Sequence, residues 1–183
     1  MGAIRANLQA VSARIERAAR AAGRDPGAVR LLAVAKTHPA ALVDEAYQAG
    51  QLAFGENYVQ EALGKMDALA CLPLEWHLIG PLQSNKAPPQ QLPELAHAVA
   101  ALPRLRLRGL MAIPEPARDV ALQRARFRVA RELLERLAAE GLALDTLSIG
   151  MSEDLEAAIA EGSTLVRVGS AIFGARQSAR DAA

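Results

Sequence analysis

Six short apolar segments, separated by longer segments with helical periodicity, most constrain what this 183-residue chain can fold into. The apolar segments occupy residues 31–35, 52–55, 76–80, 105–113, 144–149 and 165–168. Short apolar segments bounded by Gly, Pro and polar residues are typical of buried strands rather than of helices. Helices are expected at about 4–22, 40–49, 59–69, 92–102, 120–140 and 154–160. Strands that alternate with helices favour a parallel α/β fold.

Sequence motifs at the strand ends separate the two main parallel α/β architectures. A doubly wound nucleotide-binding fold loses support, because no Gly-x-Gly-x-x-Gly follows any expected strand and no P-loop pattern is present. We therefore expect a TIM-type (β/α) barrel with an extra N-terminal helix, whose chemistry lies at the C-terminal ends of the strands. The barrel is expected to form one domain over residues 1–175, and the tail 176–183 is expected to be disordered.

Composition and charge exclude several classes of protein. Hydrophobic residues make up 51% and charged residues 22% of the chain, which is ordinary for a globular protein and argues against disorder. The 21 basic and 20 acidic residues give a net charge of +1, too small to attract nucleic acid or an anionic membrane. A single cysteine, Cys71, and the lack of a signal peptide or long apolar stretch favour a cytoplasmic protein. No spacing typical of metal ligands occurs.

Lys36 is the first candidate for chemistry, because it follows the first apolar strand. Alternate residues of a strand share a face, so Leu32, Val34 and Lys36 are expected to point the same way. A partly desolvated lysine has a lowered pKa, and its free amine can form a Schiff base with an aldehyde. The alternative is a lysine whose stem packs on the strand while its ammonium group stays in water.

Two serine-containing loops follow the last two strands. Ser152 comes directly after the fifth strand, where it is well placed to cap the next helix, and the same geometry can hold a phosphate. Gly169 and Ser170 follow the sixth strand, and a glycine there lets a ligand approach the backbone closely. Because the loops after the last two barrel strands commonly form a phosphate site, the pair of loops predicts one here.

The remaining polar residues near strand ends carry weaker signals. Arg167 lies in an apolar strand, so its guanidinium needs an acceptor, which either a structural carboxylate or a ligand could supply. Asn57 and Tyr58 follow the second strand and should face the same rim as Lys36. His77 is expected to be a hydrogen-bonded core residue rather than a catalyst, and Cys71 has no nearby histidine to activate it.

Six segments, in order along the chain, closely resemble the pyridoxal phosphate homeostasis protein family. These segments are Leu32–Thr37, Phe54–Tyr58, Trp76–Lys86, Arg108–Ile113, Leu147–Ser152 and Val166–Gly174. The resemblance implies the barrel of fold type III pyridoxal phosphate proteins, which is similar to the N-terminal domain of alanine racemase. It also implies the cofactor pyridoxal 5′-phosphate (PLP).

The same resemblance implies a role for each candidate residue. Lys36 would hold PLP as an internal aldimine, Ser152, Gly169 and Ser170 would bind its phosphate, and Met151 would be a further cofactor-binding residue. Arg167 would face the pyridine nitrogen, and Asn57 would lie beside the ring. A cation next to that nitrogen disfavours its protonation and weakens the ring as an electron sink. The resemblance therefore implies a protein that buffers PLP and delivers it to PLP-dependent apo-enzymes, without robust catalysis.

Two enzymatic alternatives remain open. An amino-acid racemase of the alanine racemase type would need a second domain and a catalytic tyrosine, whereas the chain ends at its barrel and contains only Tyr47 and Tyr58. A weak racemase-like side activity would still be compatible with the sequence. A Schiff-base aldolase would also use a barrel lysine, but it would not need Arg167 beside a ring.

The chain is short for a closed barrel, which has eight strands. In the family that it resembles, roughly fifty residues, including two strands and the helix between them, follow the position of Ala87, which here runs straight into Pro88. Either this segment is truly deleted or the sequence omits part of the natural chain. An intact mass of 19.4 kDa would indicate a true deletion, and a value several kilodaltons higher would indicate an omission.

Overall fold

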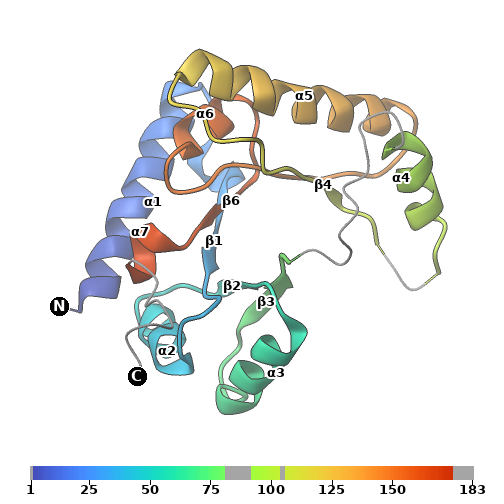
Figure 1. Ribbon diagram of the computed structural model, residues 1–183. Coiled ribbons are helices and arrows are strands. Elements are labelled where there is room, and N and C mark those ends of the chain that lie inside the picture. The colour runs from blue at the N-terminus through green and yellow to red at the C-terminus, as the bar shows by residue number, and fades with distance from the viewer. Residues whose placement is uncertain (1, 81–91, 104–105, 175–183) are drawn as a thin grey trace.

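The computed structural model describes residues 2–80, 92–103 and 106–174, in which strands and helices alternate (Figure 1). The strands are β1 (Arg30–Val34), β2 (Ala53–Glu56), β3 (Glu75–Leu78), β4 (Gly109–Met111), β5 (Thr146–Ser148) and β6 (Leu165–Val168). The helices are α1 (Ala3–Ala21), α2 (Ala40–Gln48), α3 (Val59–Ala68), α4 (Leu92–Ala100), α5 (Val120–Ala139), α6 (Leu155–Ala160) and α7 (Ser170–Phe173), with a 3-10 turn, η1 (Pro26–Ala28). None of these helices is both long and apolar enough to cross a membrane.

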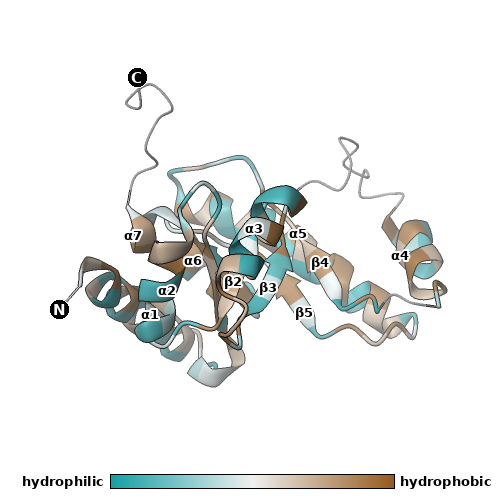
Figure 2. Cartoon of the chain, turned by 90° about the horizontal axis from the view of Figure 1, so that it is seen from below, coloured by the Kyte–Doolittle hydropathy of each residue, from teal (hydrophilic) through white to brown (hydrophobic). Residues whose placement is uncertain are grey.

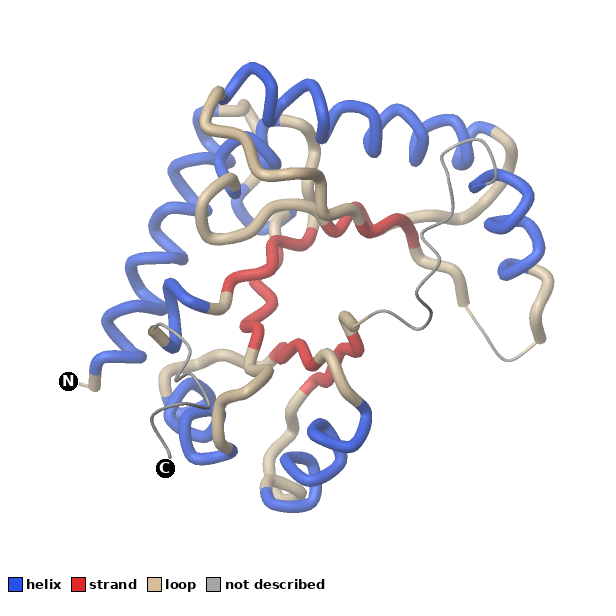
Figure 3. The backbone as a smooth tube through the Cα atoms, viewed as in Figure 1, coloured by secondary structure: helices blue, strands red, loops and turns tan. Residues whose placement is uncertain are grey.

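All six strands are parallel and form one sheet in the order β3-β2-β1-β6-β5-β4. Strands that are consecutive in the chain are neighbours, except β3 and β4, and β6 pairs with β1 as the last strand of a barrel pairs with the first. The strands trace an arc that stays open between β3 and β4 (Figure 3). The predicted α/β barrel architecture is thus confirmed for the described strands, whereas the predicted junction between Ala87 and Pro88 lies outside the described residues.

Helix α1 packs across the outside of the sheet because its apolar residues fall on one face. Ile4, Leu8, Val11 and Ile15 are buried at the spacing of three to four residues that a helix requires. The other faces carry polar residues, so hydrophilic and hydrophobic colours alternate along α1 (Figure 2). The helix ends before Gly23, whose φ of 67° belongs to the left-handed region that glycine adopts without strain.

Apolar side chains on the face of the sheet that the helices cover form most of the core. The largest cluster joins α1, α2 and α6 to β1, β2 and β6, and Phe54 and Trp76 meet in it with ring centroids 5.9 Å apart. A second cluster, with Phe127 and Leu147 at its centre, joins α5 and α6 to β5. Because both clusters contact α6, this short helix links α1 to α5.

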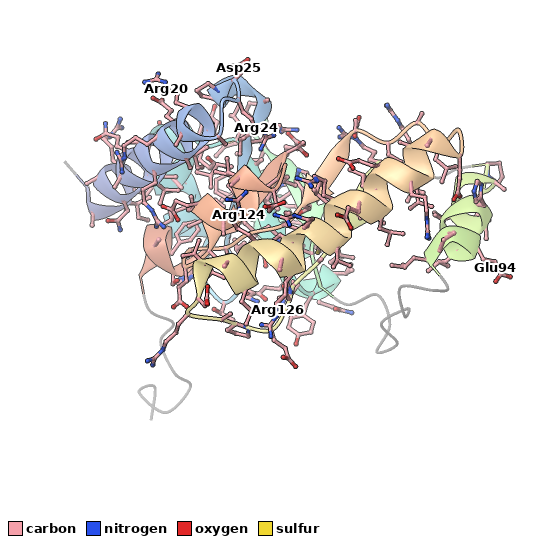
Figure 4. All side chains as sticks on the ribbon, turned by 90° about the horizontal axis from the view of Figure 1, so that it is seen from above. Arg20, Arg24, Asp25, Glu94, Arg124 and Arg126 are labelled. Carbon is pink, nitrogen blue, oxygen red and sulfur yellow. The ribbon has the colours of Figure 1, made fainter. Side chains whose placement is uncertain are left out.

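A buried carboxylate also fixes α5 to α6. Glu161, which follows α6, is 0% exposed and accepts hydrogen bonds from Arg124 at 2.8 Å, Arg131 at 3.0 Å and Arg128 at 3.1 Å. All three arginines project from α5, and Arg124 is labelled where the two helices meet (Figure 4). Burial raises the pKa of Glu161, but the hydrogen bonds from Arg128 and Arg124 outweigh it and hold that pKa below its usual value.

The fourth strand and the C-terminal segment differ from the sequence-based expectations. The sequence predicts a strand over residues 105–113, but β4 spans only Gly109–Met111. The strand is shorter because it pairs on one side only, with β5, which is itself three residues long. The short helix α7 was not expected and directly follows β6. The predicted tail 176–183 lies outside the described residues, so the domain boundary at residue 175 stays a prediction.

Candidate functional site

A cavity of about 440 Å³ lies at the C-terminal ends of the strands. It is lined by all seven residues that the sequence predicts for cofactor binding: Lys36, Asn57, Met151, Ser152, Arg167, Gly169 and Ser170. Its other lining residues are Val34, His38, Ile79, Ile113, Pro114, Pro116, Glu153, Asp154 and Gly174. The fold therefore brings together side chains that are up to 134 residues apart in the sequence, from Lys36 to Ser170.

Lys36 occupies the second position of a tight turn that follows β1. The His38 N–H donates to the Ala35 carbonyl at 3.1 Å and closes the turn. Thr37 has a φ of 66°, the only positive value at a described residue other than glycine. The ring of His38 lies 5.0 Å from that of Phe173, which ties this turn to α7. Lys36 is partly buried, as the pattern of alternating strand residues predicts.

Arg167 is buried in the floor of the cavity. It is 4% exposed, and its Nη1 donates to the Ser148 carbonyl at 2.6 Å and to Ser148 Oγ at 2.7 Å. Its Nη2 donates to the Ala112 carbonyl at 3.0 Å. Burial lowers the pKa of Arg167, and the Asp154 carboxylate opposes this shift. These acceptors are neutral, so no carboxylate among the described residues is hydrogen-bonded to the guanidinium, although the sequence left a structural carboxylate open.

The two serine-containing loops meet across the cavity. Ser152 Oγ and Ser170 Oγ lie 3.3 Å apart, although they belong to the loops after different strands. The interpretation of Ser152 as a helix cap is wrong, because α6 begins only at Leu155 and the capping position belongs to Asp154. The Asp154 carboxylate instead accepts the Met151 N–H at 2.6 Å. The Ser152 hydroxyl thus faces the Ser170 hydroxyl at the cavity and does not cap α6.

Glycines allow the loops around the cavity to pack closely. A side chain at Gly169 would place its Cβ 3.2 Å from the Val34 carbonyl oxygen, so this glycine lets the β6 loop lie against β1. A Cβ at Gly80 would overlap the backbone of Asn57, whose position is therefore fixed by the loop that follows β3. Backbone packing, rather than side-chain bonding alone, holds Asn57 and Ser170 at the cavity.

A buried ionic cluster behind Lys36 was missed by the sequence-based reasoning. Lys65, which is 7% exposed, lies within 2.7 Å of Glu56 and 3.1 Å of Glu61. Burial raises the pKa of Glu56, whereas the hydrogen bond from Lys65 opposes this rise. The one available signal was the spacing of four residues between Glu61 and Lys65, which places them on one helix face.

The weaker candidates from the sequence, His77, Tyr58 and Cys71, do not line the 440 Å³ cavity. His77 is not a core residue: its side chain is partly exposed, and Nε2 lies 2.9 Å from Glu75. It lines a second cavity, of about 430 Å³, between the strands at their opposite ends. Tyr58 is 64% exposed and is not among the residues that line the 440 Å³ cavity. Cys71 is exposed, and the described part of the chain holds no cluster of side chains able to bind a metal.

Known proteins resemble this chain in both sequence and structure. The alanine racemase N-terminal domain family matches residues 87–177. The pyridoxal phosphate homeostasis protein of Pseudomonas aeruginosa is 49% identical over 226 residues, covering 96% of this chain and 97% of that protein. The Escherichia coli protein of the same name is 44% identical over 234 residues, covering 96% and 98%. PipY of Synechococcus elongatus, solved with PLP bound, is 34% identical with a TM-score of 0.74, covering 87% and 99%.

The lengths of the alignments also show how much longer these relatives are. They extend over 226 and 234 residues, whereas the chain has 183, so each relative contains a segment of at least forty residues in total without a counterpart here. Such a segment is long enough for the two strands and one helix that would join β3 to β4 in a closed barrel. With identity of this level along almost the whole chain, the protein belongs to the pyridoxal phosphate homeostasis protein family.

Proposed function

We propose that this chain binds PLP in the 440 Å³ cavity and takes part in PLP homeostasis, holding the cofactor and passing it on without robust turnover. The names of the relatives and the PLP-bound PipY structure support this role. The recipients would be apo-enzymes that require PLP, and the chain would act in the cytoplasm. The single observation that carries the proposal is the convergence of Lys36 with a hydroxyl pair and a buried arginine on one cavity.

The cavity fits a small phosphorylated aldehyde. Its volume of about 440 Å³ lies within the range of roughly 300–1,000 Å³ that is typical of small-ligand sites. The Ser152 and Ser170 hydroxyls, 3.3 Å apart, could both donate to one phosphate group, and Gly169 leaves space for it beside the backbone. Lys36 lines the same cavity, so one ligand can reach the amine and the hydroxyl pair together.

Each residue would have a defined task. The Lys36 amine would condense with the aldehyde carbon, forming a carbon–nitrogen double bond and releasing one water. PLP, when bound, supplies an electron sink for carbanion chemistry, and its strength depends on protonation of the ring nitrogen. Arg167 would keep a positive charge near that nitrogen, because its own contacts are to neutral oxygens. This charge would disfavour protonation and suit a carrier better than a catalyst.

Absorbance titration tests the proposal. PLP added to the wild-type protein should produce a band at the violet edge of the visible spectrum, and Lys36→Ala should abolish it. The double variant Ser152→Ala/Ser170→Ala should bind PLP at least tenfold more weakly, because each lost hydrogen bond to a charged group costs about 1.5–3 kcal/mol. Pyridoxal, which lacks the phosphate, serves as the matched control and should lose no affinity in that variant. A wild-type protein without the band would exclude PLP binding through Lys36.

A second assay addresses turnover. Neither tyrosine is among the residues that line the 440 Å³ cavity, so the cavity offers no phenol as a second acid or base. Incubation of the PLP-loaded protein with L-alanine, followed by chiral separation, should therefore yield no D-alanine above the level given by free PLP. Sustained formation of D-alanine by wild type, lost in Lys36→Ala, would instead assign a racemase.

A further inference from the structure

The ionic cluster behind the site makes contacts on both sides of Lys36. Lys65 donates to the Ala35 carbonyl at 2.8 Å, as well as to Glu56 Oε1 at 2.7 Å and Glu61 Oε1 at 3.1 Å. These three acceptors satisfy all three donors of its ammonium group. The Ala35 carbonyl is also the acceptor that closes the turn containing Lys36. One side of the turn is thus fixed by a buried positive charge.

Glu61 holds the other side of the same turn. Its Oε1 accepts the Thr37 N–H at 2.5 Å in addition to the Lys65 ammonium. Thr37 has a φ of 66°, and positive φ at the third position of a turn normally requires glycine or asparagine. A threonine in this conformation costs of order 1 kcal/mol or more and persists only where its surroundings enforce it. The bond to Glu61 is a local contact that enforces it.

The cluster is not explained well by stability alone. Glu56 Oε2 is buried and accepts no hydrogen bond from any described residue. Removing two charges from water is costly, and apolar residues of the same volume often stabilise a fold as much as a buried ion pair does. A carboxylate–lysine–carboxylate cluster with one unsatisfied oxygen therefore joins α3 to β2 at a greater cost in free energy than apolar contacts would. Its geometric result is that the residues before and after Lys36 are both held.

We propose that Glu61 and Lys65 are positioning residues for Lys36, and that they clamp the Ala35 carbonyl and the Thr37 amide so that the Lys36 side chain is presented to the cavity in one orientation. The inference rests on the proposed function in one respect, since the ligand presented to Lys36 is taken to be PLP. The clamp itself is a property of the protein before any ligand binds.

Amide hydrogen exchange in the ligand-free protein measures the clamp without reference to PLP. Glu61→Ala should accelerate exchange of the Thr37 amide by about 10-fold to 100-fold, because the amide loses a charged acceptor. Glu61→Gln keeps an oxygen at this position and should restore much of the protection. Asp67→Asn, an exposed carboxylate on the same helix, is the matched control and should leave Thr37 exchange unchanged. Equal Thr37 exchange in wild type and Glu61→Ala would overturn the proposal.

Binding of PLP measures the consequence for Lys36. Glu61→Ala should weaken PLP binding at least fivefold, Glu61→Gln should recover most of the affinity, and Asp67→Asn should match wild type. Lys65→Met should weaken PLP binding more than Glu61→Ala does. If Lys65→Met does not fold, the Glu61→Ala variant alone decides the test. Uniformly faster exchange throughout β1, with unchanged PLP affinity, would show a purely structural cluster and overturn the proposal. If wild type binds no PLP through Lys36, the proposed function fails while the exchange result still decides whether the clamp exists.

Discussion

The sheet consists of a continuous half and two open edges, and the two differ in almost every physical respect. In the continuous half, β2, β1, β6 and β5, every strand has hydrogen-bonded neighbours on both sides, whereas the edge strands β3 and β4 have one each. Leu147 in β5 is 1% exposed, but Leu78 in β3 is 42% exposed. All seven predicted cofactor-binding residues lie on or directly after strands of the continuous half. These seven residues can therefore converge although the described residues form six strands, two fewer than a closed barrel.

The largest expected difference in unfolding free energy comes from truncating a leucine to alanine in each of the two regions. Leu147→Ala should lower the free energy of unfolding by about 2–5 kcal/mol, because it leaves a cavity in a packed core. Leu78→Ala removes a side chain that is already partly in water and should cost less than about 1 kcal/mol. Urea unfolding of both variants, monitored by circular dichroism, measures the difference. Equal losses would mean that the open edge is covered in solution.

A smaller difference is expected between two arginine-bound carboxylates. Glu161 is buried beside the continuous half, whereas Asp145 is exposed beside β4, and arginines hold the pKa of both below the usual values. A depressed pKa stabilises the folded state above the unfolded pKa, and the stabilisation is lost as the pH falls through the folded pKa. At neutral pH, Glu161→Gln should cost about 1.5–3 kcal/mol of unfolding free energy.

The pH dependence of unfolding provides the check. The difference between wild type and Glu161→Gln should shrink as the pH falls below the usual glutamate pKa of 4.5. Asp145→Asn should give a much smaller difference over the same range, because solvent screens an exposed pair. A larger effect from Asp145 than from Glu161 would mean that the edge, rather than the interior, carries the electrostatic stabilisation.

The smallest change in stability should accompany a charge placed on an open edge. Unpaired strand edges with exposed apolar side chains promote association between chains, and edge lysines oppose it. Leu78→Lys should leave the melting temperature within about 2 °C, since surface substitutions usually change stability by less than about 0.5 kcal/mol. The same variant should reduce concentration-dependent association in sedimentation or light scattering. Unchanged association would place the contact between chains elsewhere.

Periodicity and strand-end chemistry predicted most of this architecture. All six strands were expected, because each carries a short apolar run, and β6 begins and ends at the predicted residues. Strand-end residues such as Lys36 and Arg167 converge as parallel strands dictate, since their C-terminal ends share one rim. The family resemblance supplied the identity of the cofactor, which strand ends alone leave open.

Contacts between distant segments account for what the sequence did not reveal. The length of β4 depends on its partner β5, and the exposure of His77 depends on the opening beside β3. The acceptors of Arg167 are mostly backbone carbonyls, and because every residue has one, the sequence cannot show which of them it contacts. Lys65 resembles any helix lysine until the turn after β1 is placed against it. Such pairings are set by tertiary packing, which neither periodicity nor composition encodes.

The central claim is that the continuous half presents Lys36 to PLP although the described strands form an open arc rather than a closed barrel. The chain has only three lysines, Lys36, Lys65 and Lys86, so the site of attachment can be read without ambiguity. PLP-loaded protein is treated with borohydride, which makes the lysine–cofactor bond permanent, and its peptides are then weighed by mass spectrometry. The account predicts one modified peptide, the one that contains Lys36, at close to one PLP per chain. Modification spread over the three lysines, or confined to Lys65 or Lys86, would contradict it.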